Sequence, residues 1–109
     1  AWEQGDDAFV AIGPLADIPE NQLTRVVVSG VPVVLLRQGD KVCALAATCT
    51  HAGGPLDEGA LLPGAIVQCP WHGSRFSMQT GKVIDGPATI REPVYEVQIQ
   101  NGTVAVKRR

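Results

Sequence analysis

Several features that other classes of protein require are scarce or absent in this sequence. Its 109 residues contain no apolar run of eighteen or more, so we expect no membrane-spanning segment in the chain. Nine Lys and Arg stand against eleven Asp and Glu, and a net charge of -2 gives nucleic-acid binding no electrostatic basis. Three cysteines are too few and odd in number for a disulfide framework, which favours a reducing compartment, the cytoplasm.

No stretch has the periodicity and length of a substantial helix; at most one helical turn is expected within residues 15–23. Apolar residues come instead in short runs separated by Gly, Pro, Asn and Asp, which predicts an all-β fold. Residues 31–38 and 41–47 form one predicted hairpin around a Gly-Asp turn. Residues 94–100 alternate apolar and polar side chains, and an Asn-Gly turn then leads into a partner strand at 103–107.

The composition changes between these two hairpins. Residues 48–93 hold seven of the twelve glycines, five of the eight prolines, two of the three cysteines and both histidines. We therefore expect a single domain in which residues 1–47 and 94–109 form a β scaffold that carries 48–93 as a loop-rich insertion. Loops held by a rigid scaffold are a common place for function.

The insertion contains four residues that could bind metal at a regular spacing. Cys49 and His51 are followed, after seventeen intervening residues, by Cys69 and His72, which gives the pattern C-x-H-x17-C-x2-H. Each half of the pattern offers one sulfur and one nitrogen ligand. The third cysteine, Cys43, lies in an apolar strand run and is expected to be a small core residue.

Three sites could use such a pattern. Structural zinc commonly takes paired cysteines from a hairpin and paired histidines from a helix, and no such helix is expected here. A Cys69–His72 nucleophilic pair would leave Cys49 and His51 without a role. A two-iron cluster with both sulfurs on one iron and both nitrogens on the other would need one ligand of each kind from each loop.

The stretches CTHAGGPL (49–56) and CPWHGSRF (69–76) resemble the signature of Rieske [2Fe–2S] proteins, and the resemblance covers most of the chain. It implies an antiparallel β-sandwich scaffold with an inserted, loop-rich cluster-binding subdomain. The stretch DGPATIREP (85–93) is similar to the family's proline loop, with Gly86, Pro87 and Ala88 at the matching positions.

By this resemblance, Cys49 and Cys69 bind one iron as thiolates, and His51 and His72 bind the other, in one [2Fe–2S] cluster per chain. Two neutral imidazoles in place of two thiolates make the cluster less negative, so an added electron is repelled less. The reduction potential then falls in a window of about -150 to +300 mV.

The residues around the ligands indicate one branch of the family. Gly54 and Trp71 stand where the high-potential, bc-type members carry a disulfide, so the resemblance is to Rieske-type ferredoxins. Ser74 matches a hydroxyl that points at a cluster sulfide, whereas Phe76 lacks the hydroxyl that a Tyr would direct at a ligand sulfur. Fewer hydrogen bonds to the cluster imply a potential below the bc type. Gly73 is expected to serve the loop geometry, and Trp71 to shield the cluster.

The function that follows is one-electron transfer between a reductase and a terminal oxidoreductase, with both redox partners docking near His51 and His72. The chain has no spare histidine for a mononuclear iron site, so we expect an electron carrier and not an enzyme. The alternative is a Rieske domain from a larger membrane-anchored or catalytic polypeptide, which would be membrane-associated in the first case. A structural zinc domain is a third, remote hypothesis.

Overall fold

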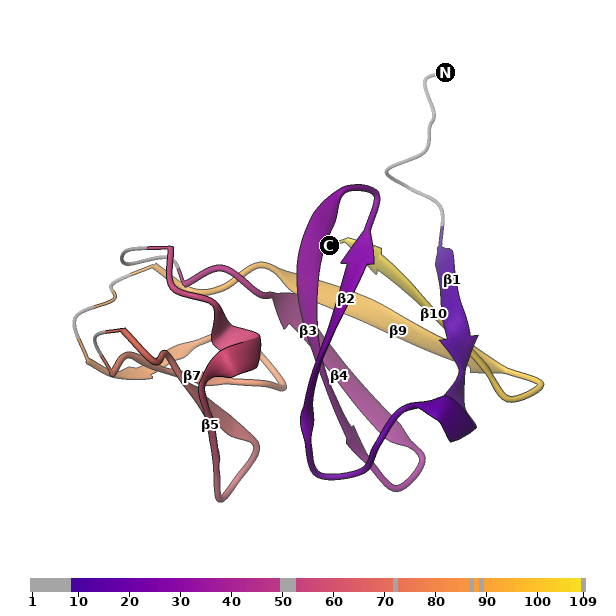
Figure 1. The fold of residues 1–109 in the computed structure, drawn as a ribbon, viewed down its shortest axis with the longest axis horizontal. Coiled ribbons are helices and arrows are strands. Elements are labelled where there is room, and N and C mark those ends of the chain that lie inside the picture. The colour runs from indigo at the N-terminus through magenta and orange to yellow at the C-terminus, as the bar shows by residue number, and fades with distance from the viewer. Residues whose placement is uncertain (1–8, 50–52, 72, 87, 89, 109) are drawn as a thin grey trace.

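The structure, a computed structural model, describes residues 9–49, 53–71, 73–86, 88 and 90–108. These residues form ten strands and two short 3-10 turns, and the strands pair antiparallel in two sheets. The all-β fold is therefore confirmed (Figure 1). None of the described residues belongs to a helix that is long and apolar enough to cross a membrane.

The larger sheet has six strands in the order β1-β10-β9-β4-β3-β2. Their bounds are β1 Val10–Pro14, β2 Leu23–Val28, β3 Val31–Gln38, β4 Lys41–Ala46, β9 Val94–Gln100 and β10 Thr103–Arg108. Both predicted hairpins are confirmed, β3–β4 and β9–β10, and the predicted helical turn is the 3-10 segment η2, Leu15–Asp17. Asn101 and Gly102 have φ of 53° and 77°, as a turn with two left-handed residues requires.

Strands β4 and β9 pair over only two positions, Ala44 with Tyr95 and Leu45 with Val94. The sheet is therefore two three-stranded halves that are joined at one point and cross each other (Figure 1). One buried cluster contains side chains from both halves: Ile18, Val28, Val33, Leu35, Ala44, Tyr95, Val104 and Val106. Burial of each large apolar side chain in such a core contributes about 1.5–3 kcal/mol.

The smaller sheet lies between β4 and β9 in the sequence and has the order β5-β6-β7-β8. Its strands are β5 Ala60–Leu62, β6 Ile66–Gln68, β7 Arg75–Ser77 and β8 Val83–Asp85, and the 3-10 turn η3, Leu56–Glu58, precedes them. The sequence predicted loops here, and the sheet was not expected. Each of these strands has three residues, too few for an alternating pattern to be recognised.

Strand β3 connects the two parts of the molecule because both of its faces are buried. Val33 and Leu35 point into the cluster within the scaffold, while Val34 and Leu36 point into a second cluster that includes the smaller sheet. Successive side chains on a strand face opposite sides, so a strand between two cores must be apolar throughout. This explains the uninterrupted run Val33-Val34-Leu35-Leu36 and places the smaller sheet against the scaffold.

Candidate metal centre

The first candidate loop begins directly after β4 and closes on itself through the backbone of Cys49. The Cys49 N–H donates to the Gly54 carbonyl at 2.8 Å, and the Gly53 N–H donates back to the Cys49 carbonyl at 2.8 Å. Gly53 has a φ of +80°, which an L side chain rarely adopts. The Leu56 N–H donates to the Ala47 carbonyl at 2.8 Å, which ties the loop to the end of β4.

The second loop, between β6 and β7, repeats this geometry. The Cys69 N–H donates to the Ser74 carbonyl at 2.8 Å, and the Gly73 N–H donates to the Cys69 carbonyl at 3.2 Å. The offsets of four and five residues from the cysteine are the same as in the first loop. Gly73 has a φ of +79°, so the predicted role of this glycine in the loop geometry is supported.

The structure therefore places Cys49 and Cys69 at equivalent positions of two matching turns. Both side chains are buried, 3% and 1% exposed, and both belong to the cluster that connects β3 to the smaller sheet. The other two predicted ligands, His51 and His72, lie outside the described residues. The described part of the site thus consists of the two candidate sulfur ligands and their surroundings.

Gly54 brings the first loop into contact with the second. A Cβ built on Gly54 would lie 2.7 Å from Cys69 Sγ and 3.0 Å from Cγ of Trp71. The backbone of one loop therefore touches both the sulfur and the indole of the other. Trp71 packs against Gly54 although it is 57% exposed.

The segment that resembles the proline loop packs on the second turn through Ser74. The Ala88 N–H donates to Ser74 Oγ at 3.1 Å, and both residues are buried. A Cβ on Gly86 would lie 2.6 Å from Ser74 Cα, so the chain passes very close to the turn. Pro87 lies outside the described residues. Because Ser74 Oγ accepts from Ala88, its own proton remains available for an acceptor at the site.

No sequence signal indicated the hydrogen bond between Ala88 and Ser74. The sequence identified the two segments separately, 69–76 by its cysteine and histidine and 85–93 by its glycine and proline at residues 86 and 87. A backbone amide, however, is present at almost every position of a chain. Its role as a donor to Ser74 follows only from the packing of the two segments.

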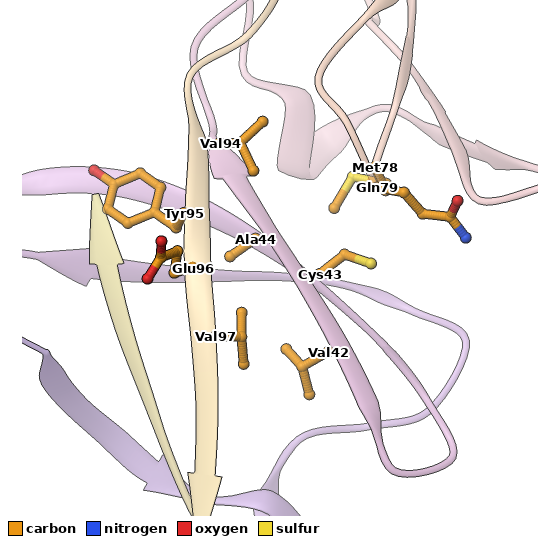
Figure 2. Close-up of a pocket in the computed structure, with 9 residues that line it drawn as sticks. All are labelled: Val42, Cys43, Ala44, Met78, Gln79, Val94, Tyr95, Glu96 and Val97. Atoms are coloured by element: carbon orange, nitrogen blue, oxygen red, sulfur yellow. The ribbon is translucent and has the colours of Figure 1, made fainter. Parts of the chain in front are cut away.

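Phe76 and Cys43 occupy apolar surroundings. Phe76, on β7, is fully buried in the same group of side chains as Cys49 and Cys69. Cys43, on β4, is partly buried and faces Met78 and Gln79 across a groove of about 330 Å³ (Figure 2). Burial raises the pKa of the Cys43 thiol, and Lys41 opposes the shift only in part. Cys43 therefore stays a neutral thiol and packs against the core as expected.

This donor set fits an iron–sulfur cluster. Two buried sulfurs come from two loops of the same shape, glycine backbone approaches closely, and one buried hydroxyl has a proton to donate. Tetrahedral zinc would more often take its two cysteines from one turn. The separation of the cysteines onto two matching turns favours a group that both loops enclose.

The comparison with protein families agrees with this geometry: the model of the Rieske [2Fe-2S] domain matches residues 8–100. The chain belongs to this family and carries a Rieske-type [2Fe–2S] cluster, a group that takes up and releases one electron at a time. Within the family, the curated relatives include ferredoxin subunits of dioxygenases. The 3-phenylpropionate/cinnamic acid dioxygenase ferredoxin subunit of Escherichia coli K12 is 33% identical over 93 residues, 85% of this chain and 87% of the relative.

Solved structures lead to the same class. The ferredoxin of carbazole 1,9a-dioxygenase from Nocardioides aromaticivorans IC177 superposes with a TM-score of 0.88 at 27% identity, over 94% of this chain and all of that chain. A chain in a complex of reduced oxygenase and oxidized ferredoxin in carbazole 1,9a-dioxygenase superposes with a TM-score of 0.83 at 32% identity, over 93% of this chain and 95% of that chain. The chain is accordingly an electron carrier of the Rieske ferredoxin type.

Proposed function

We propose that Cys49 and Cys69 bind one iron of the cluster and that His51 and His72 bind the other. The observation that carries this assignment is the pair of matching turns, each of which begins with a buried cysteine. Each turn then has its histidine two or three residues further on, so one loop can reach both irons. We also propose that residues 48–93 act as one cluster-binding unit, a division supported by the separate sheet of β5 to β8.

The ligand assignment is tested by four single variants, Cys49→Ser, Cys69→Ser, His51→Ala and His72→Ala. Each is expected to lose the visible absorption of the cluster after purification, because one iron then lacks a ligand. Cys43→Ser is the matched control, since this cysteine is partly buried elsewhere on β4 and should leave the cluster unchanged. A Rieske-type spectrum that persists in any of the four variants contradicts the assignment for that residue.

The surroundings of the cluster set its potential. The core excludes water from both sulfurs, and the Ser74 proton is available to stabilise added negative charge. Phe76 offers no second hydroxyl, and Gly54 and Trp71 leave no disulfide at the loops. We therefore place the potential below that of the bc type and above that of members without the serine.

We further propose that the chain passes electrons from a reductase to a terminal oxygenase of the dioxygenase class. Its relatives are dioxygenase ferredoxin subunits, and one similar structure is a complex of oxygenase with ferredoxin. The two loops lie at the end of the molecule opposite the β9–β10 hairpin (Figure 1). Trp71 and Ile90, 57% and 64% exposed, offer apolar contacts on the segments that border the site. A small, transient interface suits a carrier that must dissociate after each electron.

Docking is tested by stopped-flow oxidation of the reduced protein by an oxygenase component. Ile90→Asp is expected to slow the second-order rate while leaving the cluster spectrum unchanged. The same substitution at Val27, an exposed apolar residue on β2, should leave the rate unchanged. Equal effects of the two substitutions would argue against docking at this end of the molecule.

We propose that the carrier is located in the cytoplasm. Its relatives are ferredoxin subunits, and its few cysteines are typical of a protein from a reducing compartment. Cell fractionation with an antibody to the protein tests this. Recovery in the membrane fraction would instead favour the alternative, a Rieske domain that belongs to a longer, membrane-anchored or catalytic polypeptide. The full reading frame distinguishes these two arrangements directly.

A further inference from the structure

Gly54 is a glycine for reasons of space and not of backbone conformation. Its φ lies outside the left-handed region, in contrast to its neighbour Gly53 at +80°. Any L residue could adopt the Gly54 backbone. What an L residue could not do is place its Cβ, which would lie 2.7 Å from Cys69 Sγ and 3.0 and 3.1 Å from Cγ and Cδ2 of Trp71. Unbonded carbon and sulfur atoms normally stay about 3.5 Å or more apart.

The indole of Trp71 thus lies against the Cα of Gly54, and the sulfur of Cys69 lies beside both. Cys69 is only 1% exposed although it belongs to a surface loop, while Trp71 is 57% exposed. Cys69 is therefore covered by its neighbours, whereas Trp71 packs against Gly54 with part of its indole and exposes the remainder to solvent. The contact is also a contact between loops, because Gly54 follows Cys49 and Trp71 follows Cys69.

We infer that Gly54 and Trp71 form a clamp that holds the two cluster loops together and keeps water from Cys69 Sγ. Trp71 is then a positioning residue for the electron-transfer centre, and residue 54 must be a glycine for the indole to seat. The inference deepens the proposed function, because it rests on Cys69 being a ligand of the cluster.

The clamp has two measurable consequences. Without the indole, water reaches the sulfur, and a more polar environment stabilises the more negative, reduced state, so the reduction potential rises. Chelators and protons also reach the ligand sulfur more readily, so the cluster is lost faster. A side chain that only made surface contacts with a partner would change neither quantity in the isolated protein.

The experiment compares wild type, Trp71→Ala, Trp71→Phe, Gly54→Ala and the double variant Gly54→Ala/Trp71→Ala, all as purified cluster-containing proteins. Protein-film voltammetry gives the potential, and the decay of visible absorption in excess chelator gives the rate of cluster loss. Trp71→Ala should raise the potential and lose the cluster about five- to thirtyfold faster, as expected when a few packing contacts are removed. Trp71→Phe keeps a ring over Gly54 and should stay within about threefold of wild type. Val27→Ala, on β2, is the exposed apolar control and should match wild type.

The double variant tests the coupling itself. If the indole and Gly54 form one clamp, Gly54→Ala accelerates cluster loss less in the Trp71→Ala background than in wild type, because the clash with the indole is gone and only the contact with Cys69 Sγ remains. Additive effects on the logarithm of the rate would overturn the clamp. So would a wild-type potential in Trp71→Ala.

Failure of the clamp and failure of the proposed function give different results. A Cys69→Ser protein that keeps a Rieske-type cluster would overturn the ligand assignment on which the clamp rests. Loss of the cluster in Cys69→Ser together with a wild-type potential in Trp71→Ala would overturn the clamp and leave the ligand assignment intact.

Discussion

Replacement of Ser74 by Ala probes the link between the cluster loops and the segment at residues 86–88. Ser74 Oγ is fully buried and accepts the Ala88 N–H at 3.1 Å. In Ser74→Ala this amide, on a residue that is 4% exposed, loses its acceptor and cannot reach water. A buried donor without a partner costs about 1–3 kcal/mol. At about 4 °C per kcal/mol for a chain near 100 residues, the melting temperature should fall by about 4–12 °C.

The same variant removes the only proton that Ser74 can direct at the cluster, so the reduction potential should fall as well. Thermal unfolding of the cluster-containing protein by circular dichroism and voltammetry on the same samples measure both effects. Ser77→Ala is the matched control three residues further on, at the end of β7, because Ser77 Oγ accepts the amides of Gln79 and Thr80 in an exposed turn. It should lower the melting temperature only slightly and leave the potential unchanged. A Ser74→Ala protein with wild-type potential and melting temperature would refute the reasoning.

Three further predictions concern other parts of the molecule. Phe76→Tyr should raise the potential, measured by voltammetry, because it adds a hydroxyl inside the buried group of side chains that contains Cys49 and Cys69; an unchanged potential would count against Phe76 as a determinant. Gly81→Ala should lower the free energy of unfolding, measured in urea, by about 2 kcal/mol or more, because Gly81 has a φ of +75° and a Cβ there would clash with the Glu92 carbonyl oxygen. The control Gly39→Ala, at a φ of +64° with open space around it, should lower it by only about 1 kcal/mol. Equal losses would show that the close approach to Glu92 is unimportant. Burial raises the pKa of the Cys43 thiol from its ordinary value of 9.0. The stability that this shift contributes is therefore complete below about pH 9 and is lost as the pH rises through the raised pKa. Above pH 9 the free energy of unfolding of Cys43→Ala should depend less on pH than that of wild type, and parallel pH profiles would contradict this.

The two long hairpins could be predicted from the sequence because their turns and their alternation are local signals. The Asn101-Gly102 pair permits only a few turn types, and the alternation of Tyr95, Val97 and Ile99 with polar residues matches the face that packs on the core. The metal-site pattern was equally visible, since it depends on residue identity and spacing. Its link to the family came from the motifs CTHAGGPL and CPWHGSRF, and the family match supports it.

The features that the sequence did not predict are non-local. Strands β5 to β8 have three residues each and exist because they pair with one another and pack on β3. Gly54 and Trp71 were singled out as the positions of a missing disulfide, and the close contact of Gly54 with Cys69 and Trp71 depends on how the two loops meet. The amide of Ala88 likewise has a specific role only because the chain returns to Ser74. Contacts of this kind leave no periodicity in the sequence.

The most direct test of the central claim is an electron paramagnetic resonance spectrum of the purified, dithionite-reduced protein. A [2Fe–2S] cluster with two sulfur and two histidine ligands predicts a red-brown protein with a rhombic signal of low average g value, lost in both Cys69→Ser and His72→Ala. A colourless protein that contains zinc, or a signal of the kind given by an all-cysteine cluster, would contradict the account.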